Sequence, residues 1–261
     1  MAKTSFPFSN GFGDISMYKQ KGIDDITVRT KGGPSKKQVK TSSKFKRTRQ
    51  LNIEFTSATK LASKIHSTLF GLKQLGDYRI IGVLTKISIF IQKLDMISSV
   101  GKREIILSNF KSYLHGFSLN RVTMFDTVVK TPTLFTLSRD NLLATVKFPE
   151  LRQGINFFPP GTFGYYRFIA VIGIVSDVKF VNKKYKPINP LENYNPVQYR
   201  TDWFKQGVVF PEIEIKLNSG IQIDDACTMI LSVGIEFGNS PFNGVIQAVK
   251  YFGCAKVLGV E

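Results

Sequence analysis

Residues 168–175 read Phe168-Ile-Ala-Val-Ile-Gly-Ile-Val175, the longest uninterrupted apolar run of the chain. An alternating run would predict a strand with one face in water, whereas a continuous run predicts a central strand that is covered on both faces. A membrane-spanning helix needs about 20 apolar residues, so this run is too short to cross a bilayer. We therefore expect a sheet with two covered faces and no membrane span.

Strand-like runs separated by clusters of Gly, Pro and Asn surround this segment after Asn109. In one of them Ile213, Ile215 and Leu217 alternate with charged residues, which predicts a half-exposed strand. Six or seven antiparallel strands in about 140 residues are typical of a β-sandwich, which we expect over residues 111–261. The predicted strands are Leu134–Leu137, Leu142–Phe148, Tyr165–Val178, Val208–Leu217, Met229–Phe237 and Val245–Leu258.

Upstream of the strands the apolar period changes to that of a helix. Two sets of apolar residues recur at alternating steps of three and four, and Gly76-Asp77 between them suits a helix stop. Ile87, Ile89 and Ile91 also alternate as in a strand, but the helical period extends over more residues than a typical strand has. We expect an antiparallel helical hairpin within residues 55–110, and hence an α+β protein that is mainly β. The two sets are Phe55, Ala58, Ala62, Ile65, Leu69, Leu72 and Ile80, Leu84, Ile87, Ile91, Leu94.

Residues 1–54 form a basic N-terminal arm. The formal net charge of the chain is +17, and no acidic residue occurs between Asp25 and Glu54. Such a block either stays solvated or meets a polyanion such as DNA or RNA. The segments 14–19 and 24–29 predict a β-hairpin around Gly22, and Gly32-Gly33-Pro34 ends it in a basic turn. The residues expected to contact a nucleic acid or another polyanion are Arg29, Lys31, Lys36, Lys37, Lys40, Lys44, Lys46, Arg47 and Arg49.

Residues with catalytic or metal-binding chemistry are sparse. The two histidines, His66 and His115, have no Cys, Asp or Glu at the spacing of metal ligands. Cys227 and Cys254 are too few for a disulfide framework, and we expect them to be buried free thiols. The motifs of nucleotide-binding loops, serine hydrolases and zinc proteases are missing. We predict no catalytic residues, metal, cofactor or small-molecule substrate, and an enzyme is the least favoured class.

Residues 182–206 hold three prolines and several aromatic residues, and they predict a long interaction loop between two core strands. Aromatic residues in such a place fill the core, anchor an interface or stack on bases. Trp203 is the first interface candidate, and Tyr199 and Phe204 lie beside it.

Several segments together resemble an uncharacterised protein family encoded in Bacteroidetes genomes. They are Gly13-Asp-Ile-Ser-Met-Tyr-Lys19, Val28-Arg-Thr-Lys-Gly-Gly-Pro-Ser-Lys36, Phe45-Lys-Arg-Thr-Arg-Gln-Leu-Asn-Ile-Glu-Phe55, Val175-Ser-Asp177 and Gly234-Ile-Glu-Phe237. The resemblance covers nearly the whole chain and implies no activity and no site residues. The acidic residue expected before Phe45 is missing here, which favours a polyanion partner.

Two functions follow as hypotheses. The first is a non-enzymatic structural subunit of a self-assembling, virion-like or phage-derived particle, a homo-oligomer whose basic arm contacts neighbours or nucleic acid. The alternative is a stand-alone, sequence-independent nucleic-acid-binding protein. The first residues lack the apolar stretch of a secretion signal, so we expect the protein in the cytoplasm or in a particle assembled there.

Overall fold

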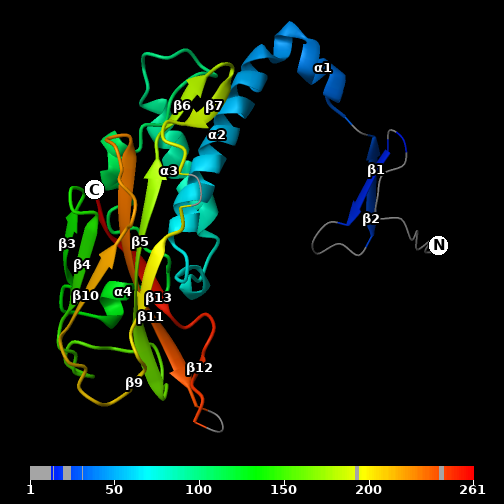
Figure 1. Cartoon of the computed structure of the whole chain (residues 1–261). Coiled ribbons are helices and arrows are strands. Elements are labelled where there is room, and N and C mark those ends of the chain that lie inside the picture. The colour runs from blue at the N-terminus through cyan, green and yellow to red at the C-terminus, as the bar shows by residue number, and fades with distance from the viewer. Residues whose placement is uncertain (1–12, 14, 20–24, 31, 192–193, 241–243) are drawn as a thin grey trace. The chain divides into compact units, whose positions relative to one another are not determined.

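The computed structural model describes residues 13, 15–19, 25–30, 32–191, 194–240 and 244–261. Strands take up 34% of the chain and helices 25%, which confirms an α+β protein that is mainly β (Figure 1). The chain forms two compact units, residues 1–49 and residues 50–261.

The first unit contains the predicted β-hairpin. Strands β1 (Ile15–Lys19) and β2 (Ile26–Thr30) pair antiparallel, while the expected turn around Gly22 lies outside the described residues. After Gly33, whose φ is +105°, a short helix α1 (Lys36–Thr41) begins at Ser35. The Ser35 hydroxyl accepts from the Gln38 amide and the Gln38 side chain accepts from the Ser35 amide, a capping box that the sequence analysis did not use. The 3-10 helix η1 (Ser43–Phe45) follows.

Helix α2 (Lys46–Thr68) starts earlier than the predicted position at Phe55. Its first turns are exposed on nearly all sides, so they carry no apolar period that could reveal them. Phe55 is 55% exposed and does not belong to the buried face, whereas Ala58, Ala62 and Ile65 do. The helix also ends at Thr68, before the predicted stop at Gly76.

The second predicted helix is confirmed over the strand alternative. Helix α3 (Ile80–Lys93) follows the 3-10 helix η2 (Lys73–Leu75). Its buried face includes Ser88 and Gln92 and is rotated from the expected one, because Ile87 is half-buried and Leu94 is 36% exposed. Gln92 at the end of α3 donates to Ser57 near the middle of α2 at 2.9 Å, as expected for an antiparallel pair.

Two sheets form most of the second unit. The large sheet has β5 and β11 at its centre, and these strands pair antiparallel along nearly their whole length. Strands β8 and β9 border β5, and β12 and β13 border β11. The small sheet has the order β10-β4-β3. The strand bounds are β3 (Leu134–Ser138), β4 (Leu143–Phe148), β5 (Tyr165–Ser176), β8 (Val197–Arg200), β9 (Phe204–Lys205), β10 (Ile213–Asn218), β11 (Cys227–Asn239), β12 (Gln247–Ala248) and β13 (Cys254–Val260).

Strand β5 lies in the middle of three layers (Figure 1) and is covered on both faces, as predicted. Phe168 and Ile172 pack with the small sheet, as in a β-sandwich, while Ile169 and Val171 pack with the helices on the opposite face. The helices and the sheet therefore share one hydrophobic cluster. Residues 50–261 form one compact unit, in which the segments expected as 55–110 and 111–261 pack together.

The predicted long loop is also wrong in part. Residues 182–206 contain three short strands, of which β7 (Lys184–Pro187) pairs with β6 (Val178–Val181) through a two-residue turn. Asn182 and Lys183 have φ values of +51° and +63°, as in the turns that suit right-twisted hairpins. Pro187 is tolerated because it is the last residue of β7, an edge strand of a two-stranded sheet.

The bounds of two strands also differ from those expected from the sequence. Strands β10 and β13 begin later than expected, at Ile213 and Cys254. Two short helices, η3 (Ser108–Leu114) and α4 (Phe125–Val128), join the helical layer to the strands. Within the described residues, no helix has both the length and the apolar character needed to cross a membrane.

Candidate nucleic-acid interface

The basic residues of the arm occupy consecutive short elements. Arg29 lies on β2, where its guanidinium stands 5.3 Å from the ring centre of Tyr18. Lys31 lies outside the described residues. All of the others are exposed except Arg49, which is half-buried. The remaining predicted contacts are Lys36, Lys37 and Lys40 on α1, Lys44 on η1, and Lys46, Arg47 and Arg49 on α2.

Arg49 has a structural role that the sequence analysis missed. Its Nη1 donates to the carbonyl oxygens of Val39 and Ser42, both at 2.8 Å. These carbonyls lie at the C-terminal end of α1, where backbone acceptors lack helical partners. Arg49 therefore holds the end of α1 and has fewer donors left for a phosphate than its neighbours.

Glu54 does not neutralise this basic surface. Its carboxylate is buried and forms an ion pair with Arg103, with Nη2 and Oε2 2.6 Å apart, and it accepts from the Gly101 amide at 2.7 Å. The hydrogen bond to Glu54 raises the pKa of the Arg103 guanidinium against the opposing effect of burial. The first carboxylate after the basic block is thus paired within the body.

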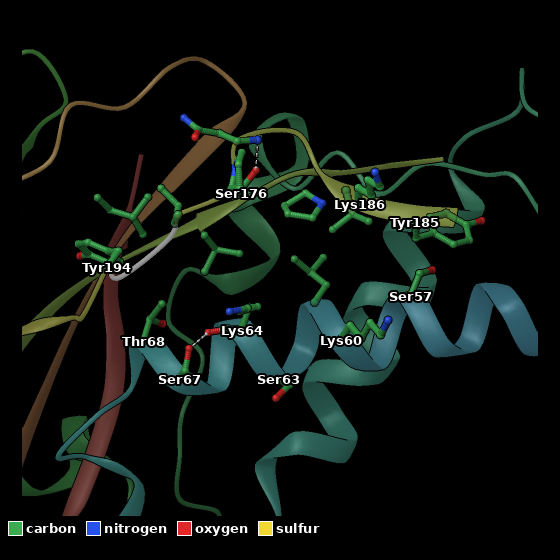
Figure 2. A pocket seen from close by; sticks show the side chains of 18 of the residues that line it. Ser57, Lys60, Ser63, Lys64, Ser67, Thr68, Ser176, Tyr185, Lys186 and Tyr194 are labelled. Carbon is green, nitrogen blue, oxygen red and sulfur yellow. Dashed lines mark hydrogen bonds between the residues drawn. The ribbon is translucent and has the colours of Figure 1, made fainter. Parts of the chain in front are cut away.

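A second basic surface lies on the body, between α2 and the described residues of 185–191 and 194–196. It surrounds a cavity of about 570 Å³ (Figure 2). We call the apolar residues of its lining, which include Leu61, Val175 and Val178, the apolar floor. Lys60 and Lys64 reach it from α2, and Lys186 from β7 on the opposite side. Tyr185 and Tyr194 also line it, at well-separated places in its wall (Figure 2).

A smaller cavity of about 350 Å³ continues the first one along α2. The two share Ser57, Lys60 and Tyr185, and the smaller one adds Lys183 from the β6–β7 turn and Lys184 from the start of β7. We call the two cavities together the α2 groove. Its described lining contains no Asp or Glu, and none of its lysines has a carboxylate partner within the described part of the chain.

The tyrosines of the groove are held in their neutral form. Burial raises the pKa of Tyr185 to about 12 and the pKa of Tyr194 to about 12. The Tyr185 hydroxyl lies 3.5 Å from Gln92 Nε2, and the Tyr185 ring meets Phe180 edge to face at 5.0 Å. Serine and threonine hydroxyls of α2 donate to the carbonyls of their own helix, for example Ser67 to Lys64 at 2.6 Å. The lysine ammonium groups are therefore the main charged donors of the groove.

The amino-acid sequence alone does not predict this groove. Its only local signals are Lys60 and Lys64, four residues apart on one helix face, and Asn182-Lys-Lys-Tyr-Lys186 at a hairpin turn. These segments are more than one hundred residues apart in sequence, and only the packing of the β6–β7 hairpin over α2 brings them together.

The three predicted interface residues are placed differently from one another. Trp203 is half-buried, with the Arg167 guanidinium 4.3 Å from its ring centre and its ring packed on Gly238. Arg167 in turn pairs with the buried Glu236 at 2.5 Å. Phe204 packs against the core between the sheets, and Tyr199 on β8 remains 48% exposed. Trp203 and Phe204 thus belong to the packing of the body, and Tyr199 is the exposed candidate.

The described residues hold no group of three or more His, Cys, Asp or Glu arranged for a metal ion. Cys227 and Cys254 are buried free thiols, as predicted. Burial raises the pKa of the Cys227 thiol to about 12, and it raises the pKa of Cys254 as well. Both therefore stay protonated at neutral pH and are poor nucleophiles.

No protein-family model, curated protein or solved structure matches this chain. The resemblance to a Bacteroidetes family stays a prediction.

Proposed function

We propose that this protein is a non-enzymatic structural subunit of a self-assembling particle, virion-like or phage-derived, which is built in the cytoplasm. In this proposal, the body provides the wall of the particle and the N-terminal arm docks on a neighbouring copy. The basic residues of the arm then face packaged DNA or RNA. The observation that carries the proposal is the apolar face of the arm hairpin.

Side chains that are paired across antiparallel strands lie on the same face. Met17 is paired with Val28. Ile15, which is paired with Thr30, and Ile26, which is paired with Lys19, fall on that same face, so four of its six positions are apolar. Val28 is 56% exposed, while Ile15 and Ile26 are each 37% exposed. The other face carries Ser16, Tyr18, Thr27 and Arg29. The hairpin is thus amphipathic, with an apolar face that is largely uncovered.

An isolated two-stranded hairpin is marginally stable in water at best, and it needs a further layer on its apolar face. None of the described residues up to Arg49 is buried, so these residues form no core among themselves. We propose a second copy of the chain as the partner. In a homo-oligomer each arm can be covered by a neighbouring copy, so no other protein is needed.

The positive charge of the arm favours a contact with nucleic acid, and it does so equally for a structural subunit and for a stand-alone nucleic-acid-binding protein. The exposed lysines of α1 and η1 form a surface with no acidic residue from position 26 to position 53. Contacts with phosphates release counterions and need no sequence readout. A stand-alone, sequence-independent nucleic-acid-binding protein would use the same surface.

Light scattering on the purified full chain, with and without nuclease, tests the proposal. We expect a large particle whose protein assembly survives nuclease treatment. A monomer that increases in size only when DNA or RNA is added would contradict the structural role and support the alternative.

A further inference from the structure

We infer that the α2 groove on the body binds single-stranded nucleic acid, with phosphates on its lysines and bases against its tyrosine rings. This site is distinct from the arm, to which nucleic-acid contact was assigned above. Packaged nucleic acid is the source of such a strand in the proposed particle, so the site rests on the proposed function in that respect.

The first argument is the number and spread of the charges. Lysines reach the groove from both walls, and the described lining has no carboxylate to balance them. The lining residues of α2 run from Asn52 to Thr68, a length of about 24 Å at the helical rise of about 1.5 Å per residue. A single phosphate would leave most of these lysines unpaired, whereas a chain with a phosphate on every nucleotide matches them along the groove. The lysines are Lys60, Lys64, Lys183, Lys184 and Lys186.

The positive charge of the α2 groove excludes the basic arm of a second copy as its occupant. The arm of a second copy would bring the basic residues of α1 and β2 next to the groove lysines, and this contact would be repulsive. The groove therefore fits an anionic partner and leaves the arm to dock elsewhere.

The second argument is the chemistry of the walls. The apolar floor and the uncharged rings of Tyr185 and Tyr194 present surfaces on which a base can lie flat (Figure 2). In a duplex the faces of the bases are stacked on one another and are not available to side chains, whereas an unpaired strand exposes them. Phosphate-binding lysines next to aromatic rings are the usual composition of a site for single strands.

The test uses the full chain and a fluorescein-labelled oligonucleotide of twelve thymidines, with binding followed by anisotropy over a range of salt. The triple variant Lys60→Gln, Lys64→Gln and Lys184→Gln removes three phosphate contacts. We expect affinity to fall at least tenfold at low salt, and the slope of log K against log salt to become shallower by about 2, at about 0.7 per phosphate for single strands.

The matched control removes the same kind of charge from the body outside the groove. Lys86 and Lys93 on α3, and Lys102 after it, are exposed and do not line the cavities. The triple variant Lys86→Gln, Lys93→Gln and Lys102→Gln should bind within about twofold of the wild type. Equal losses in the groove variant and the control would overturn the site, because the effect would then be one of net charge.

A further variant tests the ring. Tyr185→Leu keeps an apolar side chain in the wall and should lower affinity about five- to tenfold without changing the salt slope, provided that thermal melting confirms the fold. An unchanged affinity in both Tyr185→Leu and the triple lysine variant would overturn the inference. A groove-dependent loss for an anionic lipid vesicle but not for the oligonucleotide would overturn it as well.

These outcomes are separable from those of the proposed function. The groove variants leave the arm intact, so light scattering should show normal assembly while oligonucleotide binding is reduced. Normal assembly with unchanged oligonucleotide binding would reject the groove alone. A wild-type protein that binds the oligonucleotide through the groove but does not assemble would reject the proposed function alone.

Discussion

At the scale of single residues, buried charged side chains link elements of the body to one another. Glu54 is the only acidic residue between Asp25 and Asp77, and its carboxylate joins α2 to Arg103 and to the Gly101 amide. A buried ion pair contributes little relative to an apolar pair, but the removal of one partner leaves the other charge without compensation. The effect of Glu54 on stability therefore depends on its position beside Arg103 rather than on its contribution to the net charge.

Glu54→Ala should lower the free energy of unfolding by about 3 kcal/mol or more, because it leaves the Arg103 guanidinium largely buried and unpaired. Urea denaturation followed by circular dichroism measures this change. Thr56→Ala, at an exposed position of the same helix, is the control and should change it by less than about 0.5 kcal/mol. Similar values for the two variants would mean that the pair is dispensable.

Asp95 gives the stability a dependence on pH. Burial acts to raise the pKa of its carboxyl, but hydrogen bonds from the amides of Ser98, Glu104 and Ile97 outweigh burial and hold the pKa below its ordinary value. A carboxyl with a lowered pKa stabilises the fold above the pKa of the unfolded chain, and this stabilisation is lost as pH falls through the lowered value.

Asp95→Asn should therefore be less stable than the wild type at pH 7, and the difference should shrink as pH falls below about 4, through the lowered pKa of the folded protein. Thermal melting at a series of pH values measures this. Asp140→Asn, at an exposed carboxylate, is the control and should have little effect at any of them. A constant difference between Asp95→Asn and wild type across the range would show that the ionised form has no special role.

At the scale of elements, the close approach of helix and sheet depends on glycine. The position of a Cβ atom added at Gly173 on β5 would be 2.3 Å from Cβ of Thr68 at the end of α2. The sequence predicted β5 and the buried face of α2 because both have a regular apolar pattern. It did not predict their contact, because a glycine within an apolar run does not indicate which neighbouring element packs against it.

Gly173→Val should destabilise the body by about 3 kcal/mol or more, because the helix must move away from the sheet to make room. Gly82→Ala is the matched control: it is exposed on α3 with no atom near its added Cβ, and it should stabilise the helix by about 1 kcal/mol. Thermal melting of the two variants separates these effects. A melting temperature of Gly173→Val equal to that of the wild type would contradict the close packing.

Other elements were missed for reasons that are also physical. The first turns of α2 have no buried face, so periodicity could not reveal where the helix begins. Strands β6 to β9 are two to four residues long and interrupted by proline, which made them indistinguishable from a loop. The α2 groove depends on these short strands, so the sequence could not predict it either.

At the scale of the whole molecule, the fold and the proposed function depend on different parts of the chain. Residues 50–261 bury two hydrophobic clusters on the two faces of one sheet, and regular apolar patterns predicted most of it. The arm buries nothing that is described, yet its hairpin has an apolar face and its helices carry a dense positive charge. This contrast is the basis for proposing that the arm completes its fold on a second copy.

The most direct test of that claim is the sedimentation velocity of two arm variants of equal added charge. Ile15→Lys with Val28→Lys places two lysines on the apolar face of the hairpin, and Ser16→Lys with Thr27→Lys places two on the opposite face. If the apolar face docks on a neighbouring copy, the first variant sediments as a monomer and the second as the assembly. Sedimentation of both variants like the wild type would contradict the account, because the apolar face would then have no role in assembly.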